Sequence, residues 1–178
     1  MNQEKIEHIP SEEECIALLK KVGCSGKVIC HCKKVRDVAM AIAQRTNANK
    51  KLVEAGALLH DIGRSQTHKL DHAIAGRRVA ERLGLPESII CIIERHIGAG
   101  LNPKTAQSLG LPFKDYRPKT IEEKIVCHAD NLVDDCSRQN IEIEIEQALF
   151  DGKKDYAKHL VQLHKEISDL IGMDANDV

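Results

Sequence analysis

The chain has few aromatic residues and lacks long hydrophobic runs. Its 178 residues include two Phe, two Tyr and no Trp. Proteins that bind single-stranded nucleic acid without sequence preference stack the bases on aromatic side chains, so this sequence is poorly supplied for that mode of binding. No segment approaches the roughly 20 apolar residues that a transmembrane helix needs. The N-terminal segment MNQEKIEHIPSEEE also lacks the basic and then apolar order of a signal peptide.

A strong charge of either sign is also lacking, with 26 Lys and Arg against 27 Asp and Glu. This balance argues against broad attraction to nucleic acid or an anionic membrane, so we expect no stable nucleic-acid partner and no membrane association. The seven Cys residues form no C-x-x-C pair. That pattern favours a cytoplasmic, reducing compartment and small buried thiols. Cys30 and Cys32 flank His31, but adjacent helical residues point to different faces, so structural roles are expected for both thiols.

The hydrophobic pattern is helical nearly throughout. Ser11 and Glu14 form a capping box, and apolar residues recur at helical spacing from Val28 to Ile42. The predicted fold class is therefore all-α, in a single domain over residues 1–178. We expect a core of about 27–135 with an N-terminal helix 11–22 and a C-terminal helix about 154–171 packed on it. Other helices are predicted over 51–63, 72–84, 86–96 and 121–136.

Two segments depart from this pattern. Residues 98–119 contain several Gly and Pro residues, which predict a loop with one short helix inside it. Connections of this length are more often functional than idle. Residues 141–146, IEIEIE, alternate strictly, as is typical of a strand. A lone strand in a helical chain would have no partner, so a helical turn is favoured and the extended alternative stays open.

Six residues are candidate metal ligands. His60 and Asp61 are adjacent at the end of an apolar segment and offer an imidazole nitrogen and a carboxylate oxygen from one piece of backbone. Such a mixed ligand set suits a divalent transition metal such as Mn, Fe, Zn, Co or Ni. Leaving a buried carboxylate unpaired costs free energy. Asp130, in the apolar segment KIVCHADNLVD, should therefore meet a cation or several hydrogen-bond donors. The remaining four candidates, each on or beside a different predicted helix, are His31, His72, His96 and Asp130.

The order and context of these residues resemble a known family. His31 in ICHCKKVRDVAMAIA, the pair in ALLHDIGR and Asp130 in EKIVCHADNLVD match the H…HD…D signature of HD-domain metal-dependent phosphohydrolases. The resemblance runs from about Lys27 to Asp135. It implies a helical bundle that hydrolyses a phosphoester or phosphoanhydride of a small phosphorylated, nucleotide-like substrate by means of a metal-activated water.

The resemblance also implies which residues bind the metal. Family members with two ions add His residues after the HD pair, as His72 and His96 do here. The sequence looks most like the HD hydrolases that cleave diadenosine tetraphosphate symmetrically. It is more distantly similar to the HD-GYP phosphodiesterases, but IGAGLN follows His96 where the GYP element would be expected, so cyclic-di-GMP is disfavoured.

In this arrangement one or two ions bind per chain. The first ion is held by His31, His60, Asp61 and Asp130. The second is completed by the two later His residues, with Asp61 bridging and taking a catalytic role. Arg64 follows the HD pair where the family commonly carries Lys or Arg near the phosphate, and its guanidinium is suited to grip that group.

Other functions remain open at this stage. One alternative is a regulatory or non-catalytic HD module that binds a nucleotide and a metal without turnover, but a degraded sensor is expected to have lost a ligand. A structural protein stabilised by one metal is a second alternative. A phosphohydrolase that takes part in RNA processing is a third alternative. It is disfavoured by the near-zero net charge and by the lack of an appended RNA-binding domain. The substrate, the metal, one ion versus two, and the oligomeric state are not fixed by the sequence.

Overall fold

The computed structural model describes residues 7–178, and it is helical as predicted. Residues 1–6 lie outside the described part, and the expectation about a signal peptide falls largely on them. Within residues 7–178 no helix has the length and apolar character needed to cross a membrane. The all-α fold class is confirmed, because the described strands form only a two-stranded hairpin.

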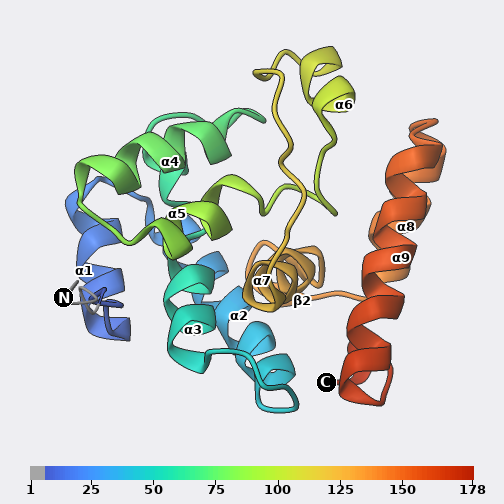
Figure 1. Cartoon of the computed structure of the whole chain (residues 1–178), viewed down its shortest axis with the longest axis horizontal. Coiled ribbons are helices and arrows are strands. Elements are labelled where there is room, and N and C mark those ends of the chain that lie inside the picture. The colour runs from blue at the N-terminus through green and yellow to red at the C-terminus, as the bar shows by residue number, and fades with distance from the viewer. Residues whose placement is uncertain (1–6) are drawn as a thin grey trace, which may run out of the picture.

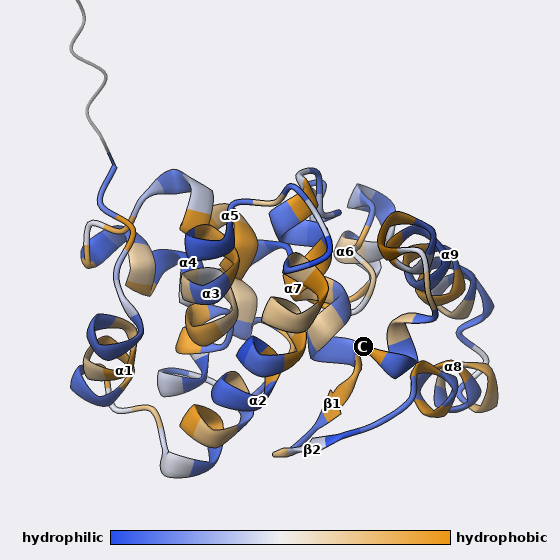
Figure 2. Cartoon of the chain, turned by 90° about the horizontal axis from the view of Figure 1, so that it is seen from below, coloured by the Kyte–Doolittle hydropathy of each residue, from blue (hydrophilic) through white to orange (hydrophobic). Residues whose placement is uncertain are grey.

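Helices α2, α3 and α7 lie side by side in the middle of the molecule (Figure 1). Helix α1 flanks them on one side, and α4 and α5 cover them. Side chains of the central helices share one apolar cluster with α8 and α9, and a second apolar cluster joins α1 to α3 and α5. Figure 2 shows hydrophobic residues on α5 and α7, while connecting loops are largely hydrophilic. The bounds of these helices are α1 Glu12–Lys21, α2 Gly26–Ala43, α3 Lys50–Leu59, α4 His72–Arg82, α5 Glu87–Glu94, α7 Ile121–Asn131, α8 Ile141–Phe150 and α9 Lys154–Ile171.

Helix α3 ends earlier than the predicted 51–63, because the chain leaves the α-helix at His60. A short 3-10 helix, η1 (Ile62–Ser65), follows and lies against α4. Gly63 allows this approach: a Cβ there would collide with the carbonyl oxygen of His72 and would lie 2.9 Å from Cα of Gly76. The glycine was expected to stop a helix, but its role is close packing of two backbones.

Helix α7 also ends earlier than the predicted 121–136. After Asn131 the chain forms a hairpin of β1 (Val133–Asp134) and β2 (Ser137–Arg138), with Asp135 at the turn in a left-handed conformation at φ 49°. The hairpin packs against α2. Apolar periodicity alone could not reveal it, since each strand has only two residues.

The same hairpin corrects the expectation that all thiols are free. Cys136 at its turn forms a disulfide with Cys30 on α2, across a sequence separation of 106 residues. Such a pair leaves no local motif, which is why the scattered Cys residues did not indicate it. Cys32 is buried and free, as expected.

The two ambiguous segments are helical in part. The 98–119 connection contains the short helix α6 (Pro103–Ser108), capped by the side chain of Asn102. The alternating IEIEIE segment belongs to α8, which forms a hairpin with α9. The chain ends in η2 (Ala175–Asp177). The division into a core of about 27–135 with flanking helices stays a prediction.

Candidate metal centre

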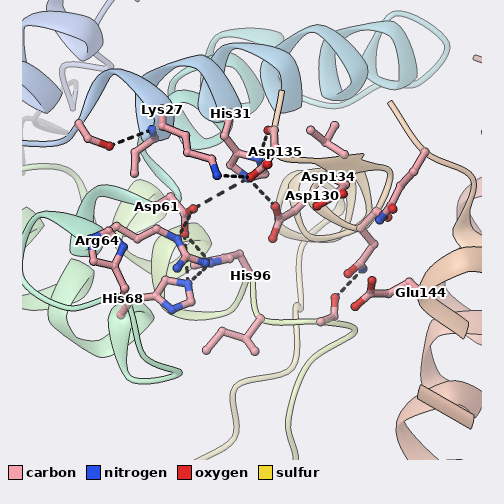
Figure 3. Close-up of a pocket in the computed structure, with 18 of the residues that line it drawn as sticks. Lys27, His31, Asp61, Arg64, His68, His96, Asp130, Asp134, Asp135 and Glu144 are labelled. Atoms are coloured by element: carbon pink, nitrogen blue, oxygen red, sulfur yellow. Dashed lines mark hydrogen bonds and ion pairs between the residues drawn. The ribbon is translucent and has the colours of Figure 1, made fainter. Parts of the chain in front are cut away.

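The structure brings all six predicted metal-ligand residues into one cluster. Figure 3 shows His31, Asp61, His96 and Asp130 around a cleft that His72 also lines, whereas His60 is fully buried behind it. The six residues come from separate elements, so the bundle itself creates the cluster. His31 is on α2 and Asp130 on α7, while the HD pair follows α3. His72 begins α4, and His96 comes just after α5.

Asp61 lies between two pairs of imidazoles and is only 3% exposed. Its Oδ1 is 3.1 Å from Nε2 of His72 and 3.4 Å from Nε2 of His96. Its Oδ2 is 3.9 Å from Nε2 of both His31 and His60. The two oxygens of one carboxylate therefore face different histidine pairs.

Asp130 faces the first of these pairs. Its Oδ1 is 3.0 Å from Nε2 of His31 and 3.4 Å from Nε2 of His60. Metal-ligating atoms of the triad His31, His60 and Asp61 lie within 4.8 Å of one another, as do those of Asp61, His72 and His96. These two groups share Asp61, and a third group that meets the same limit, His60, His96 and Asp130, connects them.

Each imidazole in the cluster is oriented by a backbone carbonyl. Nδ1 of His60 lies 2.7 Å from the carbonyl oxygen of Ala57, and Nδ1 of His96 lies 2.7 Å from that of Ile93. The same contact links His72 to Lys69 at 2.8 Å and His31 to Asp135 at 2.7 Å. Because Nδ1 of a neutral imidazole donates to these oxygens, Nε2 carries the lone pair and faces the cluster.

This arrangement leaves buried acceptors facing one another. Nε2 of His72 lies 3.0 Å from Nε2 of His96, and in these tautomers neither atom has a hydrogen to donate. Within residues 7–178, Nε2 of His60 and Oδ1 of Asp61 are buried without a hydrogen-bond partner. Buried unpaired acceptors are costly unless a cation meets them. The donor set of imidazole nitrogen and carboxylate oxygen therefore fits a divalent transition metal.

The electrostatics favour positive charge at the same place. Burial raises the pKa of Asp61, but His60 and the contacts from His72 and His96 outweigh it and hold that pKa well below its usual value. Burial lowers the pKa of His60, yet Asp130 and Asp61 together raise it to about 9, so without a metal this ring takes up a proton, which metal binding would release. Burial also lowers the pKa of His96. The two carboxylates thus stay ionised and attract a cation.

A cleft of about 490 Å³ opens over the cluster. Arg64 lies at its wall, and its Nε donates to Oδ2 of Asp61 at 2.5 Å. Two further basic residues that the sequence did not select, Lys27 and His68, line the same cleft. Lys27 lies 3.0 Å from the carboxylate of Asp135. Arg64 thus contacts Asp61 at the edge of the cleft, and its role in binding phosphate stays a prediction.

The sequence reasoning missed one side of the cleft. Its lining there comes from the β1–β2 hairpin, part of which the sequence predicted as helix, and from α8 and α9, whose positions over the cleft the sequence did not reveal. No motif pointed to these residues, because they lie after the H…HD…D signature. They are Asp134, Asp135, Gln139, Glu144 and Tyr156.

Comparison with known proteins agrees with this geometry. Residues 28–134 match the family model of the HD domain. The chain is 43% identical over 174 residues to a tRNA (cytidine(56)-2'-O)-methyltransferase of Thermoplasma volcanium, covering 98% of this chain and 52% of that protein. It is 40% identical over 164 residues to an uncharacterized protein of Methanocaldococcus jannaschii, covering 89% of this chain and 92% of that protein. The chain thus spans about half the length of the methyltransferase it matches.

The fold is similar to that of a solved HD domain. The HD domain of the L. monocytogenes phosphodiesterase PgpH, solved in complex with cyclic-di-AMP, superposes with a TM-score of 0.58 at 20% identity, covering 88% of this chain and 94% of that one. At this identity the likeness concerns the fold. The family-model match spans the helices that carry the cluster, from α2 to the end of α7 and β1. The chain belongs to the HD domain family.

Proposed function

We propose that this protein is a metal-dependent phosphohydrolase that acts on a phosphoester or phosphoanhydride of a nucleotide-like substrate. One observation carries the proposal: the two oxygens of Asp61 face separate histidine pairs, at 3.1 and 3.4 Å on one side and 3.9 Å on the other. A carboxylate with this placement is suited to bridge two cations.

Two groups of residues would hold the ions. His31, His60 and Asp130, with one oxygen of Asp61, form the first, while His72 and His96, with the other oxygen, form the second. Divalent ions held in this way supply charge neutralisation for a phosphoryl group and lower the pKa of water. The likeness to diadenosine tetraphosphate hydrolases, the identity of the metal and the presence of two ions rather than one stay predictions.

The residues of the chain contribute orientation and charge. The bonds from Nδ1 to backbone carbonyls hold the imidazoles in place, so metal binding needs little rearrangement of these rings. Arg64 lies at the cleft wall, where its terminal NH2 groups would bind phosphoryl oxygens while its Nε donates to Asp61. Burial of Asp61 and His60 excludes water from the inner side of the cluster, which strengthens these interactions.

The comparisons give limited support. The PgpH domain with the same fold is a phosphodiesterase that was solved with a cyclic dinucleotide. The tRNA methyltransferase shares its sequence with this chain over only 52% of its length, so its activity as a whole protein is not transferred. We therefore assign the reaction class from the cluster and leave the choice of substrate to experiment.

The test is hydrolysis of a substrate panel by the metal-loaded protein. The panel contains p-nitrophenyl phosphate, bis-p-nitrophenyl phosphate, nucleoside monophosphates, diadenosine tetraphosphate and cyclic-di-AMP, each with Mn, Co, Ni, Fe and Zn. We expect metal-dependent turnover of at least one nucleotide, removed by a chelator and restored by metal. Absence of turnover with every metal would overturn the proposal.

A regulatory role is the second candidate. The same sequence region accounts for 92% of the M. jannaschii protein but only 52% of the T. volcanium methyltransferase, so the domain occurs with and without additional sequence. A module that regulates another protein would bind metal and nucleotide but release the nucleotide unchanged.

We retain a cytoplasmic location, a small-molecule substrate and no stable nucleic-acid partner as parts of the main proposal.

A further inference from the structure

The cleft over the metal centre carries opposite charges at its two ends. Lys27, Arg64 and His68 line one end, and Asp134 and Glu144 line the other (Figure 3). Binding of a phosphate group explains only the first end, because phosphate is attracted to basic side chains. The acidic end calls for a different part of the ligand.

Glu144 is the half-buried carboxylate at that end, whereas Asp134 is exposed. It lies on α8 and faces the cleft from the side opposite Arg64 and His68 (Figure 3). Burial raises the pKa of Glu144, and Asp130 and Asp134 raise it further. Among residues 7–178 its side chain accepts no hydrogen bond and forms no ion pair. It is therefore available to accept hydrogen bonds from a ligand.

An aromatic ring lies at the same end. Tyr156 on α9 lines the cleft, and of the two Tyr and two Phe residues in the chain it is the one that does so. Its ring rests against Gly98, where a Cβ would lie 2.7 Å from the Tyr156 hydroxyl oxygen. Gly98 adopts a φ of +59°, so a glycine there both accepts the turn and leaves room for the ring.

We propose that Tyr156 and Glu144 form a nucleoside-binding subsite, which makes the preferred ligand a nucleotide with its phosphate at the Arg64 end and its base at the α8–α9 end. This inference rests on the proposed function of the same cleft. An aromatic ring gives a base a stacking surface, and a carboxylate accepts hydrogen bonds from N–H groups on the base edge. The negative charge of Glu144 and Asp134 disfavours a second phosphate at that end.

Binding of non-hydrolysable phosphonates tests this inference apart from turnover. The probes are the methylene phosphonate analogues of AMP and of ribose 5-phosphate, together with methylphosphonate, titrated calorimetrically into the Mn-loaded protein. The wild type should bind the AMP analogue at least about tenfold more tightly than the other two, as expected for a stacked base with a charge-assisted hydrogen bond. Equal affinity for the AMP and ribose analogues would overturn the proposal.

Glu144→Gln and Glu146→Gln provide a matched pair on α8, since Glu146 is exposed and outside the cleft lining. Glu144→Gln should reduce the affinity for the AMP analogue relative to methylphosphonate by about fivefold or more. Glu146→Gln should leave that ratio at the wild-type value. An equal loss of affinity for both probes in Glu144→Gln would mean a general structural effect and would overturn the proposal.

The experiments distinguish failure of the nucleoside-binding subsite from failure of the proposed phosphohydrolase activity. Selective binding of the AMP analogue without turnover on any substrate would support the subsite and overturn the phosphohydrolase. Turnover of p-nitrophenyl phosphate without base selectivity would support the phosphohydrolase and overturn the subsite. Tyr156→Leu gives a second check, because loss of the ring should weaken the AMP analogue more than the ribose analogue.

Discussion

Asp61 is the residue on which both ligand groups depend, since each of its oxygens faces a different histidine pair. Asp61→Ala should therefore remove metal binding and lower turnover by about a thousandfold or more, because loss of a metal-ion catalyst costs several kcal/mol. Metal content and initial rates measure both effects, and circular dichroism checks that the helices are retained.

Asp169→Asn is the control for this change, because Asp169 is an exposed carboxylate on α9 outside the cleft lining. It should leave metal content and rate at wild-type values. An Asp61→Ala protein that kept a tenth of wild-type turnover would contradict the role of this carboxylate.

His72 and His96 test the second ion at the residue scale. Their Nε2 atoms lie 3.0 Å apart and both approach Oδ1 of Asp61. If they hold a separate ion, His72→Ala and His96→Ala should each lower metal content by about one ion per chain and cut the single-turnover rate by orders of magnitude.

The control is His159→Ala on α9, which lies outside the cleft lining. Elemental analysis of the variants and the wild type shows whether a second ion is lost. Unchanged stoichiometry in both cleft variants would reduce the site to a single ion held by His31, His60, Asp61 and Asp130.

At the scale of elements, the β1–β2 hairpin supports the first ligand group. The Asp135 carbonyl at its turn orients His31 through Nδ1 at 2.7 Å. The disulfide between Cys136 and Cys30 ties the same turn to α2. Cys136→Ser should therefore loosen the hairpin and weaken metal binding by about tenfold, the effect typical of losing an outer-shell partner.

Thiol titration and metal titration together check this prediction. The oxidised protein should show five free thiols after denaturation, those of Cys15, Cys24, Cys32, Cys91 and Cys127. Cys91→Ser is the matched control, since this half-buried thiol is free and lies outside the cleft lining. Metal affinity of Cys136→Ser equal to that of Cys91→Ser would contradict a supporting role for the hairpin.

The contact between η1 and α4 is a second element-scale feature. A Cβ at Gly63 would collide with backbone atoms of His72 and Gly76, which cannot move as a flexible side chain can. Gly63→Ala should lower the free energy of unfolding by about 2 kcal/mol or more, as forced backbone shifts do. It should also weaken metal binding, since the shift displaces His72.

Gly26→Ala is the comparison, because a Cβ there meets no atom within 4 Å. At this helical position alanine should leave stability unchanged or raise it by up to about 1 kcal/mol. Urea unfolding of both variants measures the difference. Equal stability of the two proteins would contradict the packing role of Gly63.

At the scale of the whole molecule, the local signals predicted the helices well. The capping box of Ser11 and Glu14, together with helical apolar spacing, marked where helices begin. The ends of the helices were harder to predict. Helices α3 and α7 end before their apolar patterns do, because η1 and the hairpin that follow them are held in other conformations by tertiary contacts. Such contacts have no local signal.

The candidate site divides in the same way. The six candidate metal ligands could be selected from the sequence because His and Asp have distinctive chemistry and because the order of these residues matched a family. Their convergence, and the sharing of Asp61 between two groups, required the fold. Glu144 and Tyr156 could not be selected, since an acidic residue and a tyrosine on surface helices carry no distinctive signal until the cleft is known.

The most direct test of the central claim is the metal content of the wild-type protein, purified without chelators, followed by activation after reconstitution. The account predicts about two divalent transition-metal ions per chain, and hydrolysis of a nucleotide that disappears with a chelator and returns with Mn, Co, Ni, Fe or Zn. A protein that carries no metal, takes up none on titration and gains no activity from any of these ions would contradict it.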